Sequence, residues 1–164
     1  MRRRVAIGAV ILLSAISACR AGRPPAQAGS SAETYTPGLG EIMTLQQMRH
    51  VKLWFAGEAG NWDLASYELK ELQEGFDDVV KFHPTHEESP VAPRDEVPRM
   101  MNGPLSELRA AVEHKDAAAF GSAYDRLTEA CNGCHVATNF GFNRVQRPAS
   151  NPYPSQVFAV ATSR

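Results

Sequence analysis

Residues 116–138 read DAAAFGSAYDRLTEACNGCHVAT, and this stretch decides the fold. Its apolar side chains recur at alternating steps of three and four residues, at Ala117, Phe120, Tyr124, Leu127, Cys131 and Cys134. Such steps line up along one face of a helix that packs in a hydrophobic core. Residues 62–83 show the same spacing, at Trp62, Ala65, Leu69, Leu72, Phe76, Val79 and His83. These two segments predict an all-α protein.

Two further helices are predicted. One covers residues 37–57 and is ended by Gly57 and Gly60, after which Asn61 can cap the next helix. The other covers residues 99–113, whereas four prolines within residues 84–98 predict a loop. No strand pattern competes with these helices. Short first and third connections predict an up-down antiparallel four-helix bundle over residues 37–138.

The pentapeptide Cys131-Asn132-Gly133-Cys134-His135 is the attachment signature of c-type haem. The two thiols add across the haem vinyl groups, and the adjacent histidine binds the iron on its proximal face. A structural zinc site needs four ligands, whereas this motif offers three. A thiol redox pair normally opens a helix, where the dipole lowers the thiol pKa, but this pair lies near a helix end. One covalent haem c is the expected cofactor, with zinc and thiol redox chemistry as alternatives.

The N-terminus has the order of an export signal over residues 1–18, with three arginines, an apolar run and small residues. The apolar run is shorter than the roughly 20 residues that span a membrane. The ending Ile16-Ser17-Ala18-Cys19 resembles the lipobox of bacterial lipoproteins, which implies that Cys19 carries lipid. An ordinary signal peptide with a chance cysteine is the alternative. Both predict the periplasmic side of a bacterial membrane, with the protein lipid-anchored in the first case and soluble in the second.

The composition of the remaining chain suggests which partners it has. Residues 19–36 are rich in Ala, Gly, Ser and Pro and predict a flexible tether, and residues 139–164 contain three prolines and predict an extended tail. Removal of residues 1–18 leaves 14 basic and 18 acidic side chains, a net charge of −4. This charge argues against a nucleic-acid partner and favours a redox protein that is basic or neutral at its contact patch. The oligomeric state stays open, a dimer included.

Four helices with Cys-x-x-Cys-His late in the last one resemble the cytochrome c′ superfamily, which includes low-spin relatives with a methionine distal ligand. The likeness covers about residues 38–138 and departs after His135, where 29 residues follow. Histidine plus methionine ligation would imply electron transfer. Five-coordinate iron would instead imply binding of NO, CO or another small ligand. A catalytic haem enzyme is a weaker third reading, because no convincing distal acid–base set is present unless His50 lies near the iron.

Two side chains of the first predicted helix are candidates for the distal ligand. His135 lies about 28 Å along the last helix at ~1.5 Å per residue, and the same rise back along the antiparallel first helix ends near Met43. His50, about 10 Å further along, is the alternative ligand. Met43 as a core residue and His50 as a hydrogen-bonded interior or surface histidine are the competing readings. Met43 and His50 share a face with Gln47 and Trp54, and a second apolar face carries Leu45, Met48 and Phe55.

The other histidines and aromatic residues carry weaker signals. His83 is predicted to be a helix-end surface histidine, with contact to a haem propionate as the alternative. No role is assigned to His86 or His114. The aromatic side chains expected in the core are Trp54, Trp62 and Phe76.

Overall fold

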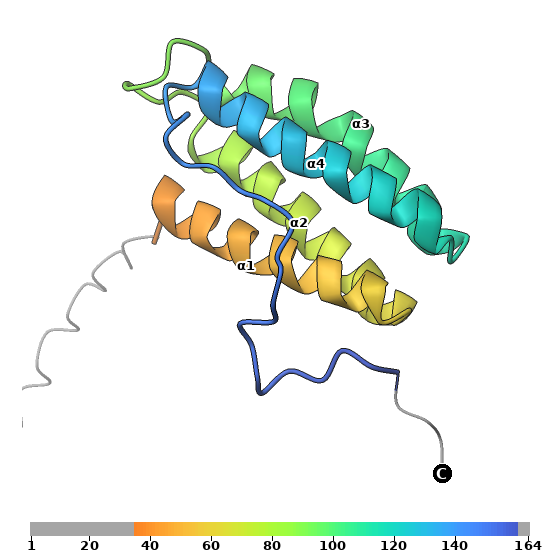
Figure 1. Ribbon diagram of the computed structural model, residues 1–164. Helices are drawn as coiled ribbons and strands as arrows, with labels where there is room; N and C mark the ends of the chain where they lie inside the picture. Colours follow the sequence, from red (N-terminus) through yellow and green to blue (C-terminus); the bar gives the residue numbers. More distant parts are fainter. Residues whose placement is uncertain (1–34, 161–164) are drawn as a thin grey trace, which may run out of the picture. The chain divides into compact units, whose positions relative to one another are not determined.

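The computed structural model describes residues 35–160, which contain four α-helices and no strand. The helices are α1 (Leu39–Glu58), α2 (Trp62–Phe82), α3 (Pro93–Glu113) and α4 (Ala117–Ala137). Each helix packs against the next along the chain, and α4 also contacts α1. Consecutive helices run in opposite directions (Figure 1). The predicted all-α class is confirmed, and the arrangement is compatible with a four-helix bundle.

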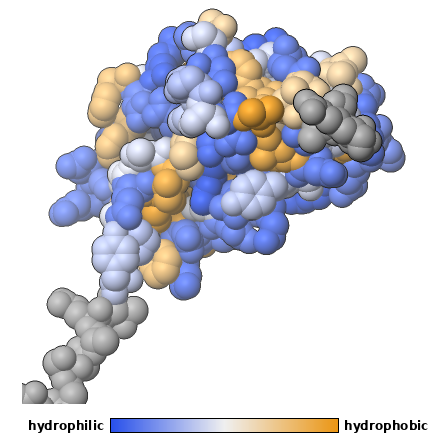
Figure 2. All heavy atoms as spheres, turned by 90° about the horizontal axis from the view of Figure 1, so that it is seen from below, coloured by the Kyte–Doolittle hydropathy of each residue, from blue (hydrophilic) through white to orange (hydrophobic). Residues whose placement is uncertain are grey.

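The predicted signal peptide, Cys19 and nearly all of the predicted tether lie outside the described residues. Within residues 35–160, no helix combines the length and the apolar character needed to cross a membrane. After α4, residues 138–160 contain turns and bends without helix or strand. On the face seen in Figure 2, apolar side chains reach the surface in several places among hydrophilic ones.

Tight turns explain why α1 and α2 are antiparallel neighbours. Gly60 adopts a left-handed backbone with φ of 64°, and the amide of Asn61 donates to the carbonyl of Ala56 at 2.9 Å. This geometry supplies hydrogen-bond donors to carbonyls at the end of α1 that would otherwise have none. The side chain of Asn61 then accepts from the amide of Leu64 at 3.2 Å, which confirms it as the cap of α2.

The third helix begins six residues earlier than predicted, at Pro93 instead of residue 99. The predicted loop over residues 84–98 is therefore wrong in its second half. Pro93 lies in the first turn, where a missing N–H costs nothing. Pro98 and Pro104 lie inside the helix and each removes a backbone hydrogen bond. Buried side chains offset that cost on the inner face, at Val97, Met101, Leu105, Leu108 and Val112.

The buried face of α1 also differs from the prediction. Leu45 is 41% exposed and Gln47 is exposed, whereas the neighbouring Gln46 is 6% exposed. The core face carries Ile42, Gln46, His50, Leu53, Trp54, Ala56 and Gly57. Two polar side chains are thus enclosed in the middle of the bundle, and they mark the region where function is to be sought.

The crossing of α1 and α4 depends on Gly57. A Cβ at this position would lie 2.1 Å from Cε1 of Phe120. The Phe120 ring is 1% exposed and packs against Trp54 and Trp62, so it has little room to move. Close approach of the two helices therefore requires glycine here.

We expect Gly57→Ala to lower the free energy of unfolding by about 1–3 kcal/mol, because the methyl group overpacks a filled core. Chemical denaturation of the full-length protein measures this loss. Gly121→Ala is the matched control, since it also lies in a helix and a Cβ there meets nothing within 4 Å. That control should gain about 0.5–1 kcal/mol. Equal stability changes in the two variants would contradict the close packing.

Candidate functional site

One cavity brings together all five residues that the sequence singled out within the described part of the chain. It has a volume of about 80 Å³ and is lined by Met43 and His50 from α1 and by Cys131, Cys134 and His135 from α4. Leu72, Phe76, Val97 and Met101 supply apolar walls. A second cavity of about 390 Å³ shares Met43, Cys134 and His135. The predicted level of Met43 along α1 thus agrees with its place beside the motif.

The two thiols of the motif lie one helical turn apart on the inner side of α4. Burial raises the pKa of Cys131 to about 12 and that of Cys134 to about 11. Both groups are therefore protonated thiols at neutral pH, and this opposes the thiolate form that redox exchange uses. No group of three or more His, Cys, Asp or Glu side chains suited to hold a metal ion occurs in residues 35–160.

The imidazole of His135 is oriented by a backbone carbonyl. Its Nδ1 lies 2.5 Å from the carbonyl oxygen of Asn143. A carbonyl can only accept, so Nδ1 carries a proton, and in the neutral ring Nε2 is then the nitrogen with the free lone pair. His135 is half-buried and lines both cavities, so this tautomer suits a histidine whose Nε2 binds a metal.

His50 is a buried histidine with both ring nitrogens engaged. Its Nε2 lies 2.8 Å from the hydroxyl of Thr128, and its Nδ1 lies 2.9 Å from the hydroxyl of Tyr124. The Tyr124 hydroxyl also lies 2.9 Å from the His50 carbonyl, and the two rings pack at 4.6 Å. Burial lowers the pKa of His50 to about 4, which keeps it neutral at physiological pH. The predicted alternative of a hydrogen-bonded interior histidine agrees with these contacts.

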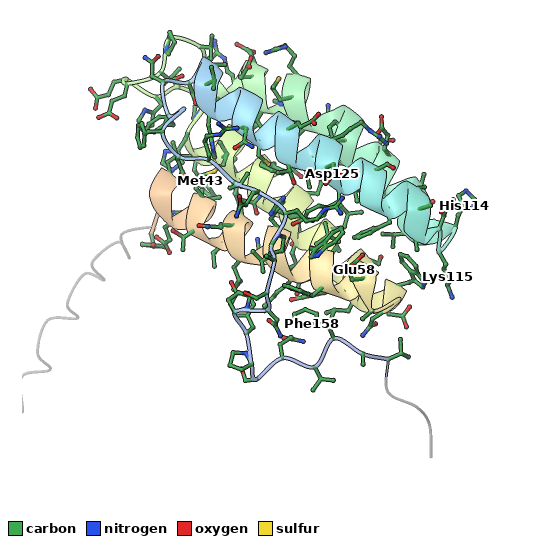
Figure 3. All side chains as sticks on the ribbon, viewed as in Figure 1. Met43, Glu58, His114, Lys115, Asp125 and Phe158 are labelled. Atoms are coloured by element: carbon green, nitrogen blue, oxygen red, sulfur yellow. The ribbon has the colours of Figure 1, made fainter. Side chains whose placement is uncertain are left out.

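Met43 lies near the start of α1, at the opposite end of the bundle from His114 and Lys115 (Figure 3). Its side chain is half-buried, packs against the core and lines both cavities. Met48 is also half-buried but lines neither cavity. Of the two methionines in α1, Met43 is thus the one placed beside Cys134 and His135.

Gln46 is a site residue that the sequence pattern missed. Its Nε2 donates to the carbonyl of Leu72 at 2.8 Å, while its buried Oε1 has no hydrogen-bond partner. A Cβ on Gly75 would lie 2.3 Å from Oε1, so glycine makes room for the amide. The lack of a side chain at residue 75, within an otherwise regular helical pattern, is the only sequence signal that could have pointed to it.

His83, His86 and the predicted core aromatic residues have structural contacts. His83 Nε2 lies 2.8 Å from the carbonyl of Pro37 and so joins the end of α2 to the chain before α1. His86 packs edge-on against Phe140 at 5.6 Å, beside the larger cavity. Trp54 and Phe76 are buried as predicted, and Trp62 is half-buried against the core.

Comparison with protein-family models, with curated proteins and with solved structures finds no match to this chain.

Proposed function

We propose that this protein is an exported c-type cytochrome that carries one covalent haem and transfers electrons. The observation that carries the proposal is the shared cavity, which places two protonated thiols, an oriented histidine and a methionine from the facing helix around one space. The motif Cys131-Asn132-Gly133-Cys134-His135 supplies the sequence signature for attachment. Bound there, haem would supply an iron that alternates between two oxidation states.

The motif residues and the apolar walls of the cavity would have separate roles in holding haem. Cys131 and Cys134 would each form one thioether, with the sulfur and its proton adding across a vinyl group. His135 would bind the iron through Nε2, because Nδ1 is held by the Asn143 carbonyl. The apolar walls of the cavity would favour the less charged, reduced state of the site.

Met43 is the better candidate for the opposite face of the iron. It lines both cavities next to His135, and its thioether has no other polar task. Ligation by His50 would require breaking its contacts with Tyr124 and Thr128 in the core. A methionine ligand closes the iron to exogenous molecules, which supports electron transfer over gas binding.

We also propose, from residues 1–19, that the protein is exported and held at the periplasmic side of a membrane by lipid on Cys19. Two or more acyl chains would hold it stably, at about 0.8 kcal/mol per buried CH₂. A tethered carrier of this kind would exchange electrons with a redox protein, and the net negative charge of the mature chain suits a neutral or basic contact patch on that partner.

The proposed sixth ligand is tested with Met43→Leu, which removes the sulfur while nearly keeping the side-chain volume. We expect the wild type to be low-spin and unreactive toward carbon monoxide, and the variant to be high-spin and to bind carbon monoxide in its reduced state. Absorption spectra of the reduced proteins with and without the gas measure both properties. The cost in stability should stay below about 1.5 kcal/mol.

Met48→Leu is the matched control, because Met48 lies on the same helix outside both cavities. It should keep the wild-type spectrum. A wild type that is already high-spin and binds carbon monoxide would favour the gas-binding function instead. A low-spin spectrum retained in Met43→Leu and lost in His50→Ala would assign the distal ligand to histidine.

A further inference from the structure

The chain after α4 is fastened to the haem motif by the side chain of Asn132. Its Nδ2 donates to the carbonyl of Val145 at 2.9 Å, and its Oδ1 accepts from the amide of the same residue at 2.9 Å. Two hydrogen bonds to one residue fix both the position and the direction of the backbone at Val145. Asn132 itself stands between the two cysteines of the motif.

The fastened segment contains the carbonyl that orients His135. Asn143 precedes Val145 by two residues, and its carbonyl oxygen lies 2.5 Å from His135 Nδ1. The side chain of Asn143 is not needed for this contact, because the backbone supplies the acceptor. The Asn132 clamp therefore limits how far the Asn143 carbonyl can move from the imidazole.

Arg147 provides a second anchor for the segment, two residues after Val145 in the chain. Its guanidinium pairs with the carboxylate of Asp125 at 2.5 and 3.0 Å and stacks over Trp54 at 4.1 Å from the ring centroid. Beyond this point the chain runs across α1 (Figure 1), and the carbonyl of Phe158 accepts from Asn61 at 3.0 Å. The segment is thus anchored at Val145 and at Arg147, and the anchor at Val145 is the one next to Asn143 in the chain.

We propose that Asn132 is a positioning residue, which clamps Val145 and thereby holds the Asn143 carbonyl on Nδ1 of His135. The inference rests on the proposed function, in which Nε2 of His135 binds iron. A carbonyl on Nδ1–H fixes the ring and makes the ligating nitrogen more basic. A more basic ligand stabilises the oxidised iron, so the clamp lowers the reduction potential.

The test compares Asn132→Ala with Asn61→Ser in the full-length, haem-loaded protein. Alanine removes both hydrogen bonds to Val145 while favouring the helix, so α4 itself is not weakened. Serine at residue 61 can still cap α2 but loses the bond to Phe158, so it loosens the chain at a point far from the motif. Neither substitution changes the net charge, which would itself shift a potential.

We expect Asn132→Ala to speed hydrogen exchange at the Val145 amide and at His135 Nδ1, and to shift the midpoint potential upward. Asn61→Ser should leave all three at their wild-type values. Nuclear magnetic resonance gives the exchange rates, and a redox titration followed by absorbance gives the potential. A role in folding alone would not produce a shift in the potential of the loaded protein.

The outcomes separate this inference from the proposed function. Unchanged exchange and an unchanged potential in Asn132→Ala, with haem attached, would overturn the inference alone. Faster exchange with an unchanged potential would reduce Asn132 to an anchor of the chain and would overturn its effect on the iron. A wild-type protein without covalent haem would instead overturn the proposed function, and with it any role of Asn132 toward iron.

Discussion

Replacement of both Cys131 and Cys134 by alanine is expected to abolish covalent retention of haem. Each thiol can form one thioether, so either single substitution should weaken attachment and the double substitution should leave no covalent link. Both side chains line the same cavity and are partly buried against the core, so alanine at these positions should leave a folded bundle. Acid–acetone extraction followed by haem staining or intact mass measures what remains attached.

Cys19→Ser is the matched control for this experiment, since it removes the third cysteine of the chain outside the motif. It should keep covalent haem at the wild-type level. The same variant should leave the membrane fraction or keep residues 1–18 uncleaved, because we propose that Cys19 carries lipid. Covalent haem in the double variant would contradict the site, whereas loss of haem in Cys19→Ser would point to a defect in maturation.

The second large effect is a dependence of stability on pH that originates at His50. Its pKa is about 4 in the folded protein because of burial, against about 6.5 for an exposed histidine. As the pH falls below about 6.5, His50 binds a proton in the unfolded chain but stays neutral in the folded protein. The contribution of His50 is therefore complete above that pH and is lost as the pH falls toward 4. The loss amounts to about 3 kcal/mol, at about 1.4 kcal/mol per pKa unit.

Denaturant titrations at pH 7 and pH 4 measure this loss for the wild type and for His50→Gln. The glutamine variant is expected to lose about 3 kcal/mol less between the two pH values, whatever its stability at pH 7. His114→Gln is the matched control, because His114 is exposed at the far end of the bundle and its replacement leaves the contacts of His50 intact. The same loss in His50→Gln as in the wild type would contradict a neutral buried imidazole.

The spacing of apolar residues predicted a helix well where the spacing was regular and a common capping residue preceded the helix. The pattern of α2 is buried from Ala65 through Val79, and Asn61 caps that helix as predicted. The start of α3 was missed because prolines argue against a helix, and their cost is offset by Val97 and the buried side chains that follow it in the helix. In α4, Ala117 is exposed although it fits the pattern, since it lies at the first residue of the helix.

The candidate site could be predicted as far as its side chains are concerned. Cys131, Cys134, His135 and Met43 were found from the motif and from the rise of antiparallel helices, and the structure places them around one cavity. The inner face of α1 was assigned to Gln47 instead of Gln46, because polar residues give no periodic signal. The hydrogen-bond acceptor for His135 could not be predicted from the sequence, because it is a backbone carbonyl that any residue could offer.

Asn143 follows the motif in the chain, so the acceptor for His135 lies in a different segment from the helix that carries the motif. The ribosome adds all residues of the four helices and of the pentapeptide before residue 143, and it adds Arg147 later still. Until then nothing can occupy Nδ1 of His135 in the way that the finished chain does. The side of the motif next to His135 Nδ1 is thus covered by residues that follow the four helices in the chain, so this cover depends on a segment that the helices themselves do not include.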